Sequence, residues 1–399
     1  MARSAKWTWT LVFVGVLVWG WTAAGQMTCL PDGMQASGSI YRICLPPANK
    51  YNHQLVIWCH GFQDAGTPVQ IPEDQLTFGD VSIPDLITGL GFGFATNSYS
   101  KTGLAVRQAM DDVLDLVHIY SEQVGKPDKV YLTGASEGGL ITTLLVEQHP
   151  DIFAGGLAAC GPIGDFAFQI DYFGNGRVLF QYFFPGLIPG NPFNPNPDLV
   201  ANWSSFYKDH VKPVILDPAN RHKVDQLVWT AHLPYDPANY LNTVEHSIRD
   251  MLRYSVVNLK DATETLGGFP FENRRTWYSG SDNDWLLNWR VIRVAASPAA
   301  IAEMRAHYDT TGDLKRPLMT IHTRYDQQVP YFHERLYDLK CLAHGTLVTE
   351  RLNWGIKRYG HCHFNADEGL AMLGLLLFYN GDLRDVNPNH VEQFVAVLH

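Results

Sequence analysis

The sequence is poor in charged residues. Only 18% of its 399 residues are charged, whereas 46% are hydrophobic, so composition excludes a disordered chain and allows a large core. The chain also lacks any basic run, and its formal net charge is -10. Because nucleic-acid-binding proteins neutralise phosphates with Lys and Arg, we expect no nucleic-acid partner. Small neutral or apolar substrates suit this composition better.

Long hydrophobic runs are absent beyond the start of the chain. Arg3 and Lys6 precede an apolar run at 11–19, and small residues follow at 22–25. This pattern is typical of a signal peptide, so we expect residues 1–25 to be removed and the protein to be secreted or periplasmic. The alternatives are a membrane anchor or a buried helix. The run is short for a membrane span and no positive cluster follows it, so we expect no stable anchor.

No CxxC pair is present, and all six cysteines lie beyond the predicted signal peptide. An even number in a chain bound for an oxidising compartment favours disulfides. Cys29 and Cys44 flank a turn-rich segment, so we predict that they pair, while the other pairings stay open. A metal site is the alternative, but the run His361-Cys362-His363 holds its side chains too close together for all three to chelate. We expect no metal and no cofactor. The remaining cysteines are Cys59, Cys160 and Cys341.

Internal repeats and low-complexity tracts are absent too, and strand and helix patterns alternate instead. Residues 104–117 place apolar side chains at helical spacing with aspartates on the other face, which predicts an amphipathic helix. A second helix is predicted at 138–149, before Pro150. This alternation predicts an α/β fold with a mostly parallel sheet and helices on both faces. The first predicted strands are 39–45, 54–59, 92–97, 129–133 and 155–160.

The alternation stops between residues 164 and 313. This stretch is rich in Phe, Tyr, Trp, Pro and Asn, and helical periodicity returns only at 244–259. We interpret it as a cap inserted over the carboxyl edge of the sheet, where α/β proteins bind ligands. An independent second domain is the alternative, but no clear linker delimits one. The predicted organisation is a signal peptide at 1–25, a core at 26–163 and 314–399, and the cap at 164–313. After the cap we predict strands 317–323 and 345–352 and helices 331–342 and 366–379.

One segment has the pattern of a nucleophile. Residues 130–139 read as an apolar strand, then the motif GxSxG centred on Ser136, then a helix. A sharp strand-to-helix turn needs small neighbours so that the backbone can adopt a strained conformation and expose the Ser hydroxyl, and Gly134 and Gly138 give that room. The alternative is a packing turn with an inert serine. The strand before it and the helix after it favour the nucleophile.

This segment resembles the α/β-hydrolase superfamily, in which the acid and then the His of the triad follow the nucleophile along the chain. The loop after strand 317–323 contains D-x-x-V-P and resembles the acid loop of the family, which implies Asp326 as the acid. Asp282 and Asp284 are rivals, but no clear parallel strand precedes them. The Gly-His pair after strand 345–352 implies His361 as the general base, with His363 as the alternative.

The resemblance also implies an oxyanion hole. Its first backbone N–H comes from the residue after the nucleophile, Glu137, and the second comes from a loop after an earlier strand. Residues 56–62 resemble the His-Gly oxyanion loop of the family, which implies Phe62 as the second donor. Structurally, His60-Gly61 can also be a plain strand-ending turn. Its place just beyond a buried strand favours the functional interpretation.

Two features resemble secreted tannase-like and feruloyl-esterase-like enzymes of this superfamily. These are the segment 95–99 ahead of a helix and the Gly-His-Cys arrangement beside His361. Ala135 stands where some of those enzymes have Cys immediately before the nucleophile. A disulfide that joins the Ser and His loops from that position is therefore excluded.

These observations lead to hydrolysis of carboxylic esters, from small-molecule or polymeric substrates, through an acyl-enzyme. A serine peptidase of the same fold is the alternative, and an exopeptidase needs acidic cap residues to bind a substrate ammonium. A non-catalytic binding protein is a third hypothesis, although such proteins typically lose a triad member. A dehalogenase is disfavoured because its nucleophile would be Asp rather than Ser136. The acidic candidates in the cap are Asp165, Asp171, Asp282 and Asp284.

Overall fold

The computed structural model describes residues 27–78 and 81–382. The predicted signal peptide lies outside these residues. A nine-stranded sheet forms the centre of the fold, in the order β1-β3-β7-β4-β8-β9-β10-β11, with β2 paired to β3. Pairing from β7 to β11 is parallel, and β3 runs antiparallel to β7. The strands are β1 Thr28–Cys29, β2 Gly33–Met34, β3 Ile40–Leu45, β4 Leu55–Cys59, β7 Gly93–Asn97, β8 Val130–Ala135, β9 Phe153–Ala159, β10 Leu318–Tyr325 and β11 Arg351–Tyr359, while β5 Thr77–Phe78 and β6 Val81–Ser82 form a separate hairpin.

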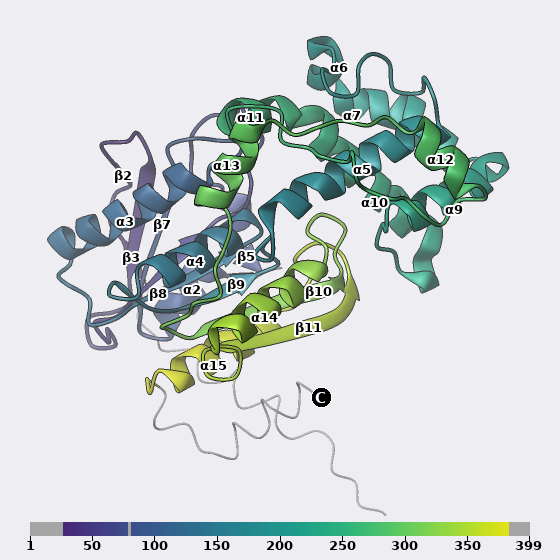
Figure 1. Ribbon diagram of the computed structural model, residues 1–399. Helices are drawn as coiled ribbons and strands as arrows, with labels where there is room; N and C mark the ends of the chain where they lie inside the picture. Colours follow the sequence, from purple (N-terminus) through teal and green to yellow (C-terminus); the bar gives the residue numbers. More distant parts are fainter. Residues whose placement is uncertain (1–26, 79–80, 383–399) are drawn as a thin grey trace, which may run out of the picture.

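Helices cover both faces of this sheet (Figure 1). All five residues of β4 are buried; Leu55 and Ile57 pack on one face, and Val56 and Trp58 on the other. The first face is covered by α3, α4 and α14, and the second by α2 and α15. This two-sided burial explains the continuous apolar run in β4. The mostly parallel sheet with helices on both faces confirms the predicted α/β-hydrolase fold class. The bounds are α2 Ile83–Gly89, α3 Val106–Gln123, α4 Glu137–Gln148, α14 Phe332–His344 and α15 Ala366–Tyr379.

Between β9 and β10 the chain forms a helical insertion with a core of its own (Figure 1). Its long helices α5 and α10 pack together, and their buried aromatic and aliphatic side chains account for the aromatic-rich sequence of this stretch. Described residues include no helix long and apolar enough to cross a bilayer. The helices of the insertion are α5 Phe166–Phe183, α6 Pro197–Ala201, α7 Trp203–Phe206, α8 Lys212–Leu216, α9 Arg221–Thr230, α10 Tyr240–Val257, α11 Leu259–Thr265, α12 Asp284–Arg290 and α13 Pro298–His307.

One predicted strand is wrong. We predicted a strand at 345–352, but Gly345 ends α14 in a left-handed conformation with φ 74°, a turn follows, and β11 starts only at Arg351. Among the described strands β11 pairs only with β10, at the edge of the sheet, so most of its residues are half-buried. Its polar residues interrupt the apolar pattern, which explains why the sequence signal was weak.

A disulfide joins Cys29 of β1 to Cys44 of β3, as predicted from their spacing. A second disulfide, which the sequence did not predict, joins Cys160 to Cys362 across 202 positions. Cys59 and Cys341 are buried free thiols. The second bridge connects the end of β9 with the loop that contains His361.

Candidate active site

Ser136 lies on the sharp turn between β8 and α4. Its backbone has φ 59° and ψ -121°, a conformation that an L-residue adopts only under constraint. Its N–H donates to the carbonyl of Ala159 at 2.8 Å, which ties the turn to β9. The strained turn lifts the hydroxyl off the end of the strand, as the sequence predicted for a nucleophile.

The glycines beside Ser136 are required by close packing. A Cβ on Gly138 would lie 2.0 Å from the carbonyl oxygen of Cys59, and one on Gly134 would lie 2.3 Å from the carbonyl oxygen of Gly138. Both contacts are with backbone, which has little freedom to move. Larger residues at either position would therefore displace the turn.

The three predicted triad residues meet in the order that the sequence implied. His361 Nε2 lies 2.8 Å from Ser136 Oγ, and His361 Nδ1 lies 2.7 Å from Asp326 Oδ2. With Nδ1 donating to the carboxylate, Nε2 is left to accept the serine proton. Geometry thus allows a proton relay between Ser136 and His361, with Asp326 fixing the ring.

The rival residues lie elsewhere. His363 is exposed, and its Nδ1 contacts the carbonyl of Tyr359 at 2.9 Å. Asp284 accepts hydrogen bonds from Ser281 at the start of α12, and Asp282 lies 2.8 Å from the ring of His222. None of the three belongs to the contacts around Ser136.

The predicted oxyanion donors border the same site. Glu137 is the first residue of α4, so its N–H has no acceptor within the helix. Within the described residues, the N–H of Phe62 also has no hydrogen-bond acceptor. The preceding loop is held by Gly61 N–H, which donates to Gln75 Oε1 at 2.7 Å, and a Cβ on Gly61 would come within 3.2 Å of Ser136 Cβ. This close approach brings the loop next to the nucleophile.

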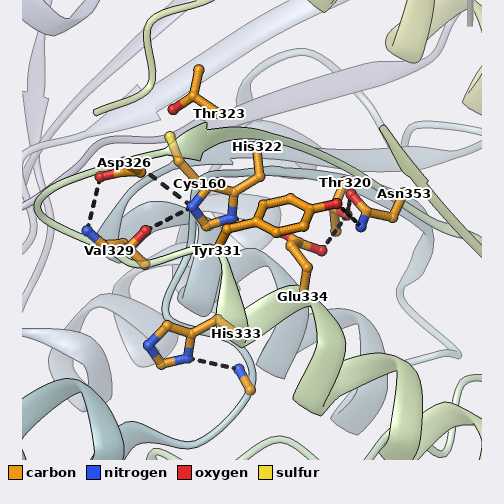
Figure 2. A network of polar contacts seen from close by, with 12 residues as sticks. Cys160, Thr320, His322, Thr323, Asp326, Val329, Tyr331, His333, Glu334 and Asn353 are labelled. Atoms are coloured by element: carbon orange, nitrogen blue, oxygen red, sulfur yellow. Dashed lines mark hydrogen bonds and ion pairs between the residues drawn. The ribbon is translucent and has the colours of Figure 1, made fainter. Parts of the chain in front are cut away.

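A buried network of charged side chains holds Asp326 from behind (Figure 2). Asp326 Oδ1 accepts from the N–H groups of Gln328 and Val329, both at 2.9 Å. His322 Nε2, on β10, lies 3.5 Å from Asp326 Oδ2. Burial alone would raise the pKa of Asp326, but His361 and His322 outweigh it and hold that pKa well below its ordinary value. Asp326 is therefore an ionised carboxylate.

His322 is a buried imidazolium. Its Nδ1 lies 2.9 Å from Glu334 Oε1 and its Nε2 lies 2.8 Å from the carbonyl of Val329, so both ring nitrogens face acceptors and must carry hydrogen. Burial would lower its pKa, but hydrogen bonds and charges of Asp326 and Glu334 raise it to about 10. Glu334 is held at a pKa of about 2, because Arg351 and His322 outweigh its burial.

His333, one position before Glu334, shows the opposite behaviour (Figure 2). Its Nδ1 accepts from the N–H of Gly164 at 3.1 Å, and its Nε2 faces Gln169 Oε1 at 2.9 Å. With Nδ1 accepting a hydrogen bond and Nε2 donating one, the ring is in its neutral form. Burial, together with the charge of nearby His322, lowers its pKa to about 3.

The disulfide Cys160–Cys362 fixes the loop of His361. Cys160 follows β9, next to the β8 strand that leads to Ser136, and Cys362 follows His361 directly. The bridge therefore joins the His loop to the sheet beside the nucleophile, from Cys160 rather than from the excluded position 135. Cys160, His361 and Cys362 are clustered, but the disulfide removes both thiolates that a metal would need.

Ser136 opens into a largely apolar cavity with about 970 Å³ of empty space, part of it continuous with solvent. Phe62 and Ser136 line it from the sheet, while Phe173 and Tyr254 line it from the insertion. The Tyr254 ring stacks on Phe173 with ring centres 4.6 Å apart and meets Phe62 edge-on. The helical insertion and the oxyanion loop therefore line the same cavity.

The acidic side chains in this cavity are not the predicted ones. Asp165 caps α5, and Asp171 accepts from the N–H of Glu272; neither they nor Asp282 and Asp284 are among the lining residues. The acidic lining residues are Glu137 and Asp261. Burial raises the pKa of Glu137 to about 8, so its carboxyl holds its proton at neutral pH. Asp261 is ion-paired: its Oδ1 lies 3.2 Å from Lys101 Nζ.

Sequence reasoning missed three buried ionisable side chains: His322 beside Asp326, and the cavity-lining side chains of Glu137 and Arg177. A His inside the otherwise apolar strand pattern 317–323, four positions before Asp326, is a signal that can be read without a structure. For Arg177 and Glu137, no local pattern distinguishes a lining side chain from a surface one. Their burial depends on how the insertion packs on the sheet.

The model of the prolyl oligopeptidase family matches residues 88–175. This stretch contains β7, α3, β8, the Ser136 turn, α4 and β9. No curated protein matches the chain.

Solved structures resemble the chain at low identity. The Pyrococcus furiosus esterase Pf2001 is 11% identical with a TM-score of 0.45, over 88% of this chain and 89% of that chain. For Pyrococcus horikoshii acylaminoacyl peptidase the identity is 12% and the TM-score 0.42, over 87% of this chain and 39% of that chain. Leishmania major oligopeptidase B is 10% identical with a TM-score of 0.45, over 89% of this chain and 37% of that chain. The chain thus spans less than half of either peptidase.

The fold and the contacts among Ser136, His361 and Asp326 identify a serine hydrolase of the α/β-hydrolase class. The arrangement can carry out acyl transfer to a serine hydroxyl and then to water.

Proposed function

We propose that this chain hydrolyses carboxylic esters through an acyl-enzyme. Ser136 Oγ attacks the ester carbonyl while His361 Nε2 takes its proton and then gives it to the leaving alcohol. Asp326 stabilises the imidazolium that forms, and the N–H groups of Phe62 and Glu137 stabilise the oxyanion. Water repeats the sequence and releases the acid. The observation that carries the proposal is the Ser136–His361–Asp326 contact chain in the wall of an apolar cavity.

Esters are favoured over peptides by the charge of this cavity. An exopeptidase that acts from the amino terminus requires an ionised carboxylate for the substrate ammonium. Of the acidic lining residues, Glu137 is protonated and Asp261 is paired with Lys101. The remaining lining is mainly aromatic and aliphatic, which suits an apolar acyl or alcohol group. The tannase-like and feruloyl-esterase-like sequence features belong to the same proposal and favour aromatic esters.

A peptidase is the second candidate, and the match to the prolyl oligopeptidase family model over the nucleophile segment favours it. Aminoacyl p-nitroanilides and p-nitrophenyl esters of matched acyl groups separate the two, because the same triad must expel a poorer leaving group from the anilide. Faster turnover of the anilides would replace the ester proposal with a peptidase.

The experiment that tests the proposal compares p-nitrophenyl acetate, butyrate and octanoate turnover by the wild type and Ser136→Ala. We expect kcat to fall by about 10⁶-fold in the variant and fluorophosphonate labelling to disappear. Ser279→Ala is the control, because Ser279 is exposed and lies in the insertion. Circular dichroism checks that all three proteins fold. A folded wild type that neither labels nor turns over any ester would contradict the assignment.

We also propose that the protein is secreted or periplasmic. The predicted signal peptide and the disulfides Cys29–Cys44 and Cys160–Cys362 support this location. Amino-terminal sequencing of the exported protein should start near residue 26, and a start at Met1 would contradict the proposal.

A further inference from the structure

One face of α5 forms a wall of the cavity. The lining residues Phe166, Ile170, Phe173, Gly174 and Arg177 recur at helical spacing, and Arg177 lies about 16 Å along the helix axis from Phe166 at 1.5 Å per residue. Just before α5, Gly161 packs against Gly139 of the nucleophile helix. The helix therefore starts beside α4 and runs away from it into the insertion (Figure 1).

Arg177 is a buried cation without an anionic partner. Its side chain is only 2% exposed, and within the described residues its one hydrogen bond joins Nη1 to Gln181 Oε1 at 3.3 Å. Its Nε is buried without any acceptor. No described carboxylate forms an ion pair with it, and no described aromatic ring lies beneath its guanidinium at cation–π distance. Burial lowers its pKa to about 10, so the group still carries its charge at neutral pH.

Other arginines in the fold show that this condition is unusual. Arg351 is also buried, but it contacts Glu334 and Asp338. Burying a guanidinium without such a partner is strongly unfavourable, so a fold retains it where something else compensates the charge. Phe193, Phe269 and Phe271 line the same cavity as Arg177, and their side chains supply no acceptor. In so apolar an environment an anion reaching Arg177 would bind it strongly and in a fixed orientation.

We propose that Arg177 binds an anionic group of the substrate, most simply a carboxylate, carried by the part of the ester that occupies the cavity. This inference rests on the proposed ester hydrolysis and adds a substrate class to it. In this arrangement Ser136 attacks the ester carbonyl and the aromatic walls of the cavity contact the apolar part of the substrate. The guanidinium of Arg177 pairs with the substrate carboxylate. Specificity then comes from a charge distant from the reacting bond.

Matched substrate pairs test this. One series compares p-nitrophenyl esters of ω-carboxy acids with six, eight and ten carbons against the corresponding uncharged acyl esters. A second compares acetate esters of ω-hydroxy acids with the matched alkyl acetates, which places the charge on the alcohol side. In at least one series we expect kcat/KM to favour the anionic ester by about tenfold or more, and Arg177→Gln to abolish that preference while changing turnover of uncharged esters by less than about threefold.

The matched control is Arg275→Gln, because Arg275 is an exposed arginine of the same insertion, and this variant should keep the preference. Arg177→Met serves if the Gln variant folds poorly, and it should melt no lower than the wild type because it removes an unpaired buried charge. A wild type that hydrolyses uncharged esters but shows no anionic preference in either series would overturn the role of Arg177 alone. A wild type inactive on every ester would instead overturn the proposed function.

Discussion

Buried ionisable side chains form one group behind Asp326 and another in the wall of the cavity, and the two groups differ in how their charges are balanced. Behind Asp326, the side chains of His322, Glu334 and Arg351 each face a partner of opposite charge. On the cavity side, Glu137 accepts one backbone N–H, and Arg177 has one weak contact with Gln181. We call the first group a closed network, because each of its members faces a partner of opposite charge. The members of the second group do not.

This difference separates two uses of buried charge. A network in which every member has a partner fixes positions, and here it fixes the carboxylate that orients His361. Groups without partners of opposite charge are unfavourable to folding, so we propose that those in the cavity act on what enters it. Substitutions in the closed network should therefore reduce stability or proton transfer. Those on the cavity side should leave folding intact and alter substrate or pH preference.

The largest expected effect comes from Asp326→Asn. The amide keeps the shape of the side chain but cannot stabilise the His361 imidazolium, so we expect kcat to fall by about 10⁴-fold. Initial rates with p-nitrophenyl butyrate measure it. The rival acids Asp282→Asn and Asp284→Asn are the controls and should stay within about twofold of the wild type. A comparable loss in either control would move the acid role away from Asp326.

Glu334→Gln should cause the largest loss of stability. It leaves the Arg351 guanidinium and the His322 ring buried without their shared carboxylate, and breaking such a buried pair costs about 3–5 kcal/mol in the free energy of unfolding. Urea denaturation measures this. Glu264→Gln is the matched control, since its pair with Lys260 is exposed and spans 3.8 Å, and we expect no measurable change there. Equal stability of the two variants would show that the network is not closed.

The buried histidines His322 and His333 should give opposite pH dependence. Since the pKa of His322 is raised to about 10, its contribution is complete below pH 6.5, the unfolded value, and is lost as pH rises toward 10. Since the pKa of His333 is lowered to about 3, its neutral ring favours folding above pH 6.5, and that contribution is lost as pH falls toward 3. His322→Gln should remove the alkaline slope, on the order of 2 to 4 kcal/mol, and His333→Gln the acidic one.

Denaturant titrations at pH 4, 6.5 and 9.5 distinguish these slopes. If His322→Gln instead flattened the acidic side, the ring would be neutral in the folded protein, and the network behind Asp326 would not be a charged one.

The strands that position the triad were largely predictable from the sequence. β4 and β8 are mainly apolar runs buried on both faces, and the order of Ser136, Asp326 and His361 along the chain follows from the strands that precede them. The misplaced strand at 345–352 shows the limit. Most residues of the edge strand β11 are only half-buried, so it has no continuous apolar pattern, although the Gly-His pair still marked the loop after it.

The cavity side was not predictable, because long-range packing creates it. Cys160 and Cys362 are 202 positions apart, and Arg177 becomes a buried lining residue only when α5 packs against α10 and the segment 269–271. Local patterns specify helices and strands, but which polar side chain remains without a partner depends on every neighbour brought to it by the fold. The Glu137 carboxyl is an example, since the sequence assigned a role only to its backbone N–H.

Glu137→Gln tests the smallest effect, in the pH profile. Burial raises the pKa of this carboxyl to about 8, from 4.5, so the folded protein keeps the proton while the unfolded chain loses it. Stability therefore falls as pH rises from 4.5 to about 8, and the variant should lack this slope. Above pH 8 the ionised carboxylate lies beside the N–H that is proposed to hold the oxyanion, so negative charge there opposes the transition state. Between pH 7 and 9 we expect kcat/KM to fall roughly tenfold in the wild type and less than about twofold in Glu137→Gln.

The Ser136→Ala protein supplies the blank for spontaneous hydrolysis at pH 9, and Glu122→Gln on the exposed side of α3 is the matched control. If kcat/KM of Glu137→Gln fell between pH 7 and 9 as much as that of the wild type, the titration of another group would cause the fall. Glu137 would then be an uncharged part of the wall at all working pH values, and the cavity side would hold a single functional charge, that of Arg177. If the fall disappears, the charge of Glu137 acts on the reaction, as the contrast with the closed network behind Asp326 predicts for a cavity-side group.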